Sequence, residues 1–220
     1  MDAARAAWHS LLSAIFPDRC VLCERVGFPP ICLYCRQQLV PISPSDQPAL
    51  PPDGLDLLRI GFHYSGRMQQ AITQYKYGRS TALGGTLADL VHQDFTAFEL
   101  LENLDVIAPV PIHWRRWTAR GFNQTEILCS RLPRSIVDHE AISRIRFTPP
   151  QASLTLMERR TSLLGAFSSD ERLEGRRVLI VDDVYTSGST VAECAKALRA
   201  AGAAWVGAYA LASTLRIADP

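Results

Sequence analysis

Apolar residues in this chain gather in short, mostly β-branched runs that alternate with amphipathic stretches. Short apolar runs predict buried strands, and apolar positions three to four residues apart predict helices. We expect strands at 57–64, 105–110, 141–147, 178–181 and 204–212 and helices at 67–77, 81–95, 125–132 and 191–201. Alternating strands and helices are typical of a parallel sheet with right-handed crossovers.

The first 54 residues do not follow this alternation. Residues 1–16 predict a short helix, because their apolar side chains share one stripe and Pro17 ends it. Such a helix packs on its own protein or, alternatively, lies on a membrane surface or a partner. Residues 41–54 contain five prolines, which indicates a linker. We therefore expect an N-terminal unit at 1–40, a linker at 41–54 and a main domain at 55–220.

The composition limits the classes of function. The chain has 220 residues and a net charge of +1, which argues against a bulk electrostatic nucleic-acid binder but leaves room for a local basic patch. We expect no transmembrane helix, since no uncharged apolar run approaches about 18 residues. We also expect no signal peptide, and hence a cytoplasmic protein whose association with the inner face of the membrane would depend on partners.

Four of the six cysteines lie close together in two C-x-x-C pairs: Cys20, Cys23, Cys32 and Cys35. Four thiolates at this spacing can close a tetrahedral zinc site, and in a cytoplasmic protein this is more common than a disulfide. The alternative is a redox pair or incidental thiols. Because such a site is closed, the metal would be structural and would supply most of this unit's folding energy. Cys129 and Cys194 have apolar, helical surroundings and are expected as small core residues.

Two carboxylates, Asp182 and Asp183, follow the apolar run at 178–181. In open α/β sheets, ligands bind just outside the carboxyl ends of the strands. Next comes a loop of small residues that opens a helix, where free backbone N–H groups can hold a phosphate: Thr186, Ser187, Gly188, Ser189 and Thr190. The alternative is a buried strand with two solvated acids at its tip. Paired acids at strand ends also occur in phosphate-receiver domains and as metal ligands of nucleotidases. The sequence contains no Walker A loop and no G-x-G-x-x-G motif.

Three arginines follow the strand at 105–110: Arg115, Arg116 and Arg120. Their planar guanidinium groups suit a multiply charged anion, although a solvated basic loop is the alternative. The neighbouring Trp114, Trp117 and Phe122 also suit stacking on single-stranded bases. The tryptophans can equally pack the cysteine unit against the main domain.

Further cations lie where they can approach the same site. Lys76 ends a predicted helix and could reach a phosphate, or it could be a solvated cation at a helix end. The long polar segment 148–164 carries Arg159 and Arg160. Long loops in compact domains are usually functional or disordered, and this one would act as a lid that brings both arginines over the site.

The run at 178–190 resembles the signature of the type I phosphoribosyltransferases, which bind phosphoribosyl pyrophosphate (PRPP). The resemblance implies that Asp182 and Asp183 hold the ribose hydroxyls and that residues 186–190 surround the 5′-phosphate. It also implies Mg²⁺ bound with PRPP, and a catalytic set of Asp182, Asp183, Arg159 and Arg160. Lys76 and the loop arginines would complete the PRPP contacts.

The whole chain resembles the ComF or GntX-like family of bacterial competence proteins. The resemblance rests on F-P at 16–17, the two C-x-x-C pairs, R-G-F-N-Q at 120–124, Q-x-x-L at 151–154 with the two arginines at 159–160, and the PRPP signature, in that order. It implies an α/β fold, a type I phosphoribosyltransferase-like parallel sheet flanked by helices, with an N-terminal zinc module built on four cysteines. Many members carry a further C-x-x-C pair, whereas residues 36–60 of this chain contain no cysteine.

The family resemblance leaves three functional interpretations open. The protein could transfer a phosphoribosyl group to an unidentified acceptor, or it could bind PRPP as a signal. In the third interpretation it is a DNA-uptake factor that binds single-stranded DNA or a competence helicase and keeps a vestigial pocket. The intact PRPP positions disfavour a vestigial pocket, and the balanced net charge disfavours DNA binding as the sole activity.

Overall fold

The computed structural model describes residues 19–27, 30–48, 51–52, 54–78, 81–113, 117–118, 121–146 and 163–215. The predicted N-terminal helix, the loop arginines Arg115, Arg116 and Arg120, and the predicted lid up to residue 162, with Arg159 and Arg160, lie outside these residues.

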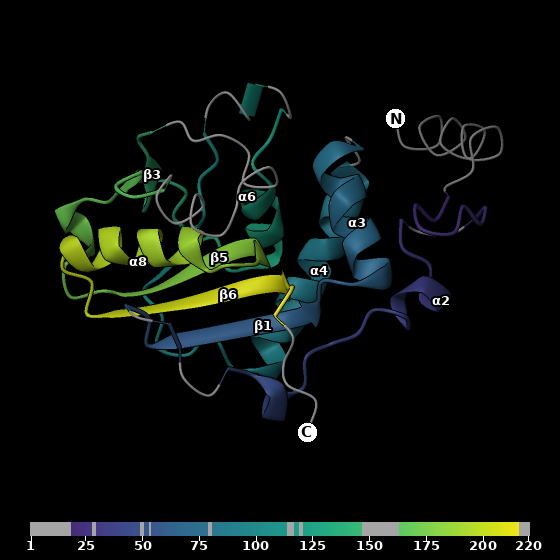
Figure 1. Ribbon diagram of the computed structural model, residues 1–220, viewed down its shortest axis with the longest axis horizontal. Helices are drawn as coiled ribbons and strands as arrows, with labels where there is room; N and C mark the ends of the chain where they lie inside the picture. The colour runs from purple at the N-terminus through teal and green to yellow at the C-terminus, as the bar shows by residue number, and fades with distance from the viewer. Residues whose placement is uncertain are drawn as a thin grey trace, which may run out of the picture.

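Four parallel strands form the main sheet in the order β1-β6-β5-β2 (Figure 1). Their bounds are Leu57–His63, Trp205–Ser213, Arg177–Tyr185 and Val106–Pro109. The central strand β5 pairs with β2 on one side and with β6 on the other. Residues 178–181 of β5 are completely buried, because helices cover both faces of the sheet. The parallel sheet predicted from the apolar runs is confirmed.

Alternate residues of the central strands face two different layers. Leu179 and Val181 of β5 pack on the side of α3 (Gly66–Tyr77) and α4 (Thr81–Ala97). Their neighbours Val178 and Ile180 pack on the side of α8 (Ser189–Ala200). Figure 1 shows α8 and α4 on opposite sides of the sheet. This alternation follows from the two-residue repeat of a strand, and it fixes the direction in which the end of β5 presents its acids.

Short helices fill the connections between these elements. Their bounds are Leu33–Arg36 for α2, Gln124–Leu128 for α6, and Pro44–Asp46, Cys129–Arg131 and Glu171–Leu173 for the 3-10 helices η1, η2 and η4. The helix predicted at 125–132 is thus α6 continued by η2.

The strand predicted at 141–147 is wrong as a member of the main sheet. Only Ser143–Arg144 form a strand, β3, which pairs antiparallel with β4 (Phe167–Ser168) in a separate two-stranded sheet. The position beside β2 is occupied by a single parallel bridge between Ile107 and Val137. Ala141 and Ile142 are buried in the layer that contains α8, so the apolar character that suggested a strand reflects core packing.

Part of the proline-rich stretch 41–54 pairs with the outer edge of β1. The N–H of Ile42 donates to the carbonyl oxygen of Gly61 at 2.8 Å, and the N–H of His63 donates to that of Val40 at 2.9 Å. The side chain of Gln47 exchanges hydrogen bonds with the backbone of Ile60. These contacts cover an edge that would otherwise expose unpaired backbone groups.

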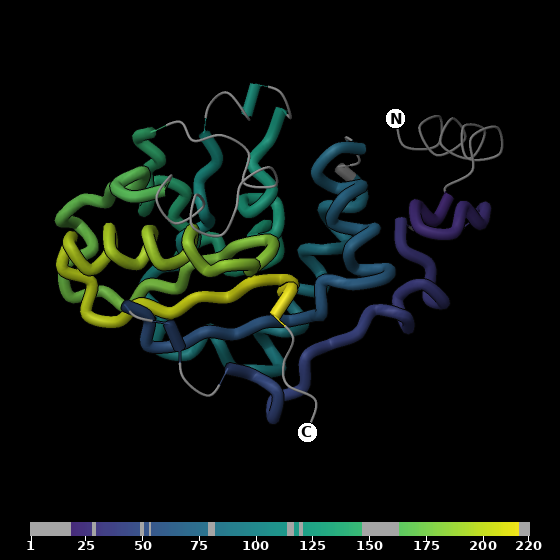
Figure 2. The backbone as a smooth tube through the Cα atoms, viewed as in Figure 1, coloured from purple at the N-terminus to yellow at the C-terminus, as the bar shows by residue number. Residues whose placement is uncertain are grey.

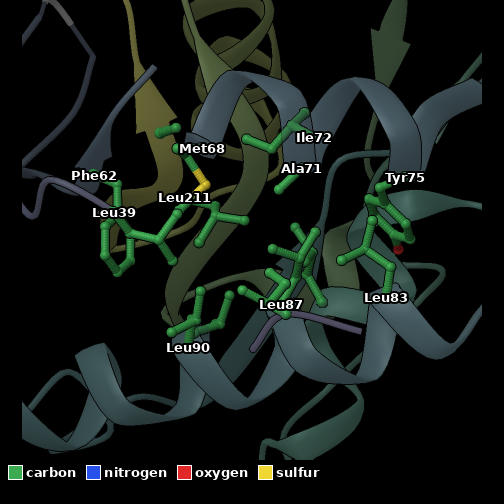
Figure 3. Packing of buried hydrophobic residues seen from close by; sticks show 14 of the residues in the cluster. Leu39, Phe62, Met68, Ala71, Ile72, Tyr75, Leu83, Leu87, Leu90 and Leu211 are labelled. Carbon is green, nitrogen blue, oxygen red and sulfur yellow. The ribbon is translucent and has the colours of Figure 1, made fainter. Parts of the chain in front are cut away.

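The described residues 19–27 and 30–40, here called the cysteine segment, pack against the sheet domain. Figure 2 follows this segment from its purple N-terminal part to the edge of β1. Cys20, Leu22 and Leu39 belong to the same buried cluster as Met68 of α3 and Phe62 of β1. In Figure 3, Leu39 lies beside Phe62 and near Leu211 of β6. The cysteine segment and α3 therefore share one apolar core.

Candidate functional site

The two acids of the predicted PRPP signature lie in the last part of β5. Asp182 pairs in register with Ala210 of β6, and Asp183 follows it on the opposite face of the strand. Both acids are partly buried, and Oδ1 of Asp182 accepts a hydrogen bond from the N–H of Asp183 at 2.8 Å. β5 thus brings two acceptor groups to the carboxyl end of the sheet, where α/β proteins bind their ligands.

The carboxyl group of Asp182 is held in a partly protonated state near neutral pH. Burial and the adjacent charge of Asp183 raise the pKa of Asp182 to about 7, although Lys76 and Arg144 act in the opposite direction. A carboxyl group with this pKa can accept from or donate to a sugar hydroxyl. A bound cation would favour its ionised form.

Lys76 forms an ion pair with the second acid. Its Nζ lies 2.8 Å from Oδ1 of Asp183, and the two side chains are only 21% and 13% exposed. Burial opposes the charge of Lys76, but the attraction of Asp183 outweighs it and raises the pKa of Lys76. Lys76 is therefore not the solvated helix-end cation of the alternative interpretation. The last turn of α3 directs it into the acidic site.

The predicted phosphate loop ends at the N-terminus of α8. Gly188 caps this helix with φ at 72°, in the left-handed region, and the Oγ atoms of Ser187 and Ser189 lie 2.8 Å apart. A Cβ on Gly188 would collide with the buried side chain of Tyr185. The positive φ and the lack of room for a side chain therefore both favour glycine here. The first turn of α8 contains no acidic residue. The positive end of the helix dipole would therefore attract an anion.

The return of the arginine loop to the core is fixed by an internal hydrogen-bond network. Thr125 Oγ1 donates to the carbonyl oxygen of Val110 at 2.6 Å, and Asn123 Oδ1 accepts from the N–H of Thr125 at 3.3 Å. The Asn123 amide donates to the same Val110 oxygen at 3.3 Å. These bonds join the start of α6 to the end of β2. Of the two loop tryptophans, Trp117 is 53% exposed and is not buried against the cysteine segment.

Sequence reasoning did not single out two residues that lie near the acids. The charge of Arg144 lowers the pKa of Asp182, and its guanidinium lies 5.3 Å from the centre of the Phe167 ring. Tyr75 donates a hydrogen bond of 2.8 Å to the carbonyl oxygen of Gln124. Neither position has a distinctive motif, since Arg144 lies in a two-residue strand and Tyr75 falls on the buried stripe of α3.

The four cysteines of the C-x-x-C pairs converge on one point. Their sulfur atoms all lie within 4.8 Å of one another, and those of Cys23 and Cys32 are 3.6 Å apart. Bonds of about 2.3 Å to a tetrahedral zinc ion would place sulfurs about 3.8 Å apart. Burial raises the pKa of the Cys20 thiol, but hydrogen bonds, first from the N–H of Cys32, outweigh it and lower that pKa to about 6. This cluster can bind a metal ion.

The main sheet belongs to a phosphoribosyl transferase domain. The family model described as "Phosphoribosyl transferase domain" matches residues 118–218, which include β5, the phosphate loop and α8.

Relatives extend the similarity to nearly the whole chain. It is 35% identical over 207 residues to the "DNA utilization protein YhgH" of Escherichia coli O157:H7, covering 89% of this chain and 90% of the relative. It is 33% identical over 167 residues to "Competence protein F" of Haemophilus influenzae, covering 71% and 72%. The chain therefore belongs to the ComF-like family, as the order of its motifs predicted.

A solved structure entitled "Structure of the allosteric regulatory enzyme of purine biosynthesis" is also similar, at 21% identity with a TM-score of 0.37. It covers 58% of this chain and 26% of the other. The fold assignment rests on the sheet itself and on the family model. Among the described helices, none combines the length and apolar character needed to cross a membrane.

Proposed function

We propose that this protein binds PRPP together with Mg²⁺ and acts in DNA utilisation or competence, as the names of its relatives indicate for them. The observation that carries the proposal is the ion pair of Lys76 with Asp183 on β5, the strand that leads into the Gly188-capped N-terminus of α8. A ligand with two ribose hydroxyls, a 5′-phosphate and a pyrophosphate has groups for each of these elements. Asp182 and Asp183 would hold the hydroxyls, and residues 186–190 would hold the 5′-phosphate.

Transfer of the phosphoribosyl group would break the bond between ribose C1 and the pyrophosphate oxygen and form a bond from C1 to a nucleophilic atom of the unidentified acceptor. Positive charge then develops on the sugar and negative charge on the leaving pyrophosphate. Lys76, Arg115, Arg116 and Arg120 are proposed to stabilise the leaving group, and Arg159 and Arg160 to close over it and exclude water. Mg²⁺ bound with the ligand would offset the remaining charge.

Three domain assignments accompany this proposal. We propose that residues 1–40 form a structural zinc unit with Cys20, Cys23, Cys32 and Cys35 as ligands, supported by the convergence of the four sulfurs. Residues 41–54 would join it to the phosphoribosyltransferase-like domain at 55–220. Because all four positions around the metal are taken by protein sulfur, the ion would not take part in catalysis.

Binding of single-stranded DNA, directly or beside a helicase partner, is a second candidate function. The exposed ring of Trp117 in the arginine-rich loop supports it, because exposed aromatic rings beside cations suit base stacking. A salt series with an oligonucleotide tests it. We expect Trp117→Ala to weaken binding by about 1–3 kcal/mol, and unchanged affinity would remove this candidate.

Pyrophosphate release distinguishes an enzyme from a PRPP sensor. The protein is incubated with PRPP and Mg²⁺ against a panel of bases, nucleotides and single-stranded DNA, and released pyrophosphate is measured. A phosphoribosyltransferase releases pyrophosphate only with its acceptor, and Asp182→Asn with Asp183→Asn should abolish that release. Asp89→Asn is the matched control, because Asp89 is an exposed acid paired with Arg131 away from the site. Release that persists in the double variant would contradict the assigned role of the acids.

A further inference from the structure

Helix α3 contacts the cysteine segment at its beginning and the acidic site at its end. It has 12 residues and therefore spans about 18 Å. Both ends make polar contacts with parts of the chain that are distant in sequence. The inference drawn from this arrangement rests on the proposed binding of PRPP.

Arg67, in the first turn of α3, donates to two acceptors of the cysteine segment. Its Nη1 lies 2.5 Å from the carbonyl oxygen of Leu22, and its Nε lies 3.1 Å from Oε1 of Gln38. Leu22 stands between Cys20 and Cys23, and Gln38 follows Cys35 by three residues. Both acceptors therefore depend on how the segment folds around its four thiols.

The middle of α3 is held by close packing. Met68, Ala71, Ile72 and Tyr75 are 0–1% exposed. Figure 3 shows this face of the helix directed toward Leu87 and Leu90 of α4, with Leu211 of β6 close to Met68. A helix packed in this way moves as one body, because dense interiors do not deform residue by residue.

The end of α3 contacts two parts of the ligand site. Lys76 pairs with Asp183 at 2.8 Å, and Tyr75 donates to the carbonyl oxygen of Gln124 at the end of the arginine loop. A shift of α3 by one or two ångströms would break the ion pair and release Asp183 from its counter-charge. It would also move the point at which the arginine loop returns to the core.

We propose that Arg67 is a positioning residue that couples metal binding by the four cysteines to PRPP binding at Asp183. A folded, metal-bound segment presents the Leu22 and Gln38 acceptors, Arg67 holds α3 against them, and α3 holds Lys76 and Tyr75 in place. Loss of the metal would take the Leu22 and Gln38 acceptors away from Arg67. The contacts of Lys76 and Tyr75 at the other end of α3 would then loosen. Such coupling is reciprocal, so PRPP must also strengthen metal retention.

The test measures zinc release from the full-length protein into a colorimetric chelator, with and without PRPP in excess Mg²⁺. We expect PRPP to slow zinc release by about fivefold or more in the wild type, within the usual range of coupling between sites. In Arg67→Ala, zinc release should no longer respond to PRPP, and PRPP affinity measured by calorimetry should fall by a similar factor. Gln38→Ala removes one of the two acceptors that Arg67 contacts in the cysteine segment. It should also reduce the response of zinc release to PRPP.

Arg36→Ala is the matched control. Arg36 also joins the cysteine segment to the main domain, but its 2.6 Å hydrogen bond from Nη2 goes to Oε1 of Gln93 on the exposed surface of α4, not to α3. This variant should keep the response of zinc release to PRPP. If PRPP binds without changing zinc release, or if Arg36→Ala and Arg67→Ala lose the response equally, the coupling through α3 is wrong. Absence of any PRPP binding to the wild type would instead overturn the proposed function, and the coupling with it.

Discussion

At the scale of single residues, the site combines groups that would be unfavourable in an ordinary core. Two adjacent acids are partly buried, and one lysine reaches them from a helix 107 residues earlier in the chain. The sequence revealed the acids because they follow an apolar run. It could not reveal that Lys76 pairs with Asp183, because this contact depends on how α3 packs against β5.

The raised pKa of Asp182 predicts a pH-dependent cost to stability. Its pKa is about 7 in the folded protein and 3.8 in an unfolded chain, so the folded state holds this proton more tightly. Between pH 3.8 and 7 the folded state binds more protons than the unfolded chain. The free energy of unfolding therefore falls as the pH rises toward 7. We expect Asp182→Asn to unfold with a free energy about 1–3 kcal/mol higher than the wild type at pH 8, with the two proteins converging below pH 4.

Urea unfolding from pH 4 to 8 measures this difference. Asp89→Asn serves as a control, because it removes one acid that is half exposed and lies in an ion pair away from the site. Parallel pH profiles for Asp182→Asn and the wild type would mean that Asp182 ionises normally.

A second prediction at the residue scale concerns the stability cost of replacing Gly188. Alanine there would adopt an unfavourable positive φ and would also meet the Tyr185 ring, so we expect a loss of about 2–4 kcal/mol in the free energy of unfolding. Gly175→Ala is matched, since its φ is 70° and, apart from its chain neighbours, no described residue has an atom within 4 Å of the added Cβ. It should cost only about 1–2 kcal/mol. Equal losses would show that Tyr185 does not restrict this position.

At the scale of elements, the apolar pattern predicted the four strands of the main sheet and the helices α3, α4 and α8, with ends within a few residues. It failed at 141–147, where buried Ala141 and Ile142 have the composition of a strand but pack without pairing. Periodicity reports burial, and it cannot separate a buried loop from a buried strand. The same limit applies to the proline-rich stretch 41–54, whose composition did not indicate pairing with β1.

The prediction at the scale of elements concerns zinc binding by the cysteine segment. Cys35→Ser should reduce bound zinc from about one ion per chain and lower Tm by about 4–8 °C, since the segment shares its core with α3. Zinc content and thermal unfolding are measured together. Cys129→Ala, at a buried cysteine outside the metal cluster, should lower Tm but keep the zinc. A Cys35→Ser protein with full zinc content would contradict the four-thiolate site.

At the scale of the whole molecule, the order of motifs predicted both the family and the class of fold, because each motif carries its own chemistry and the combination is specific. The relative placement of the two sites could not be predicted. It depends on α3, whose sequence shows an amphipathic helix but not the partners at its ends. Only the folded chain shows that Arg67 and Lys76 join the cysteine segment to the acids.

Binding of PRPP is the central claim, and isothermal titration calorimetry of the full-length protein with PRPP tests it most directly. We expect one PRPP per chain, binding that requires Mg²⁺, and loss of binding in the Asp182→Asn, Asp183→Asn double variant but not in Asp89→Asn. A wild-type protein that is folded, contains its zinc and shows no Mg²⁺-dependent heat with PRPP would contradict the account.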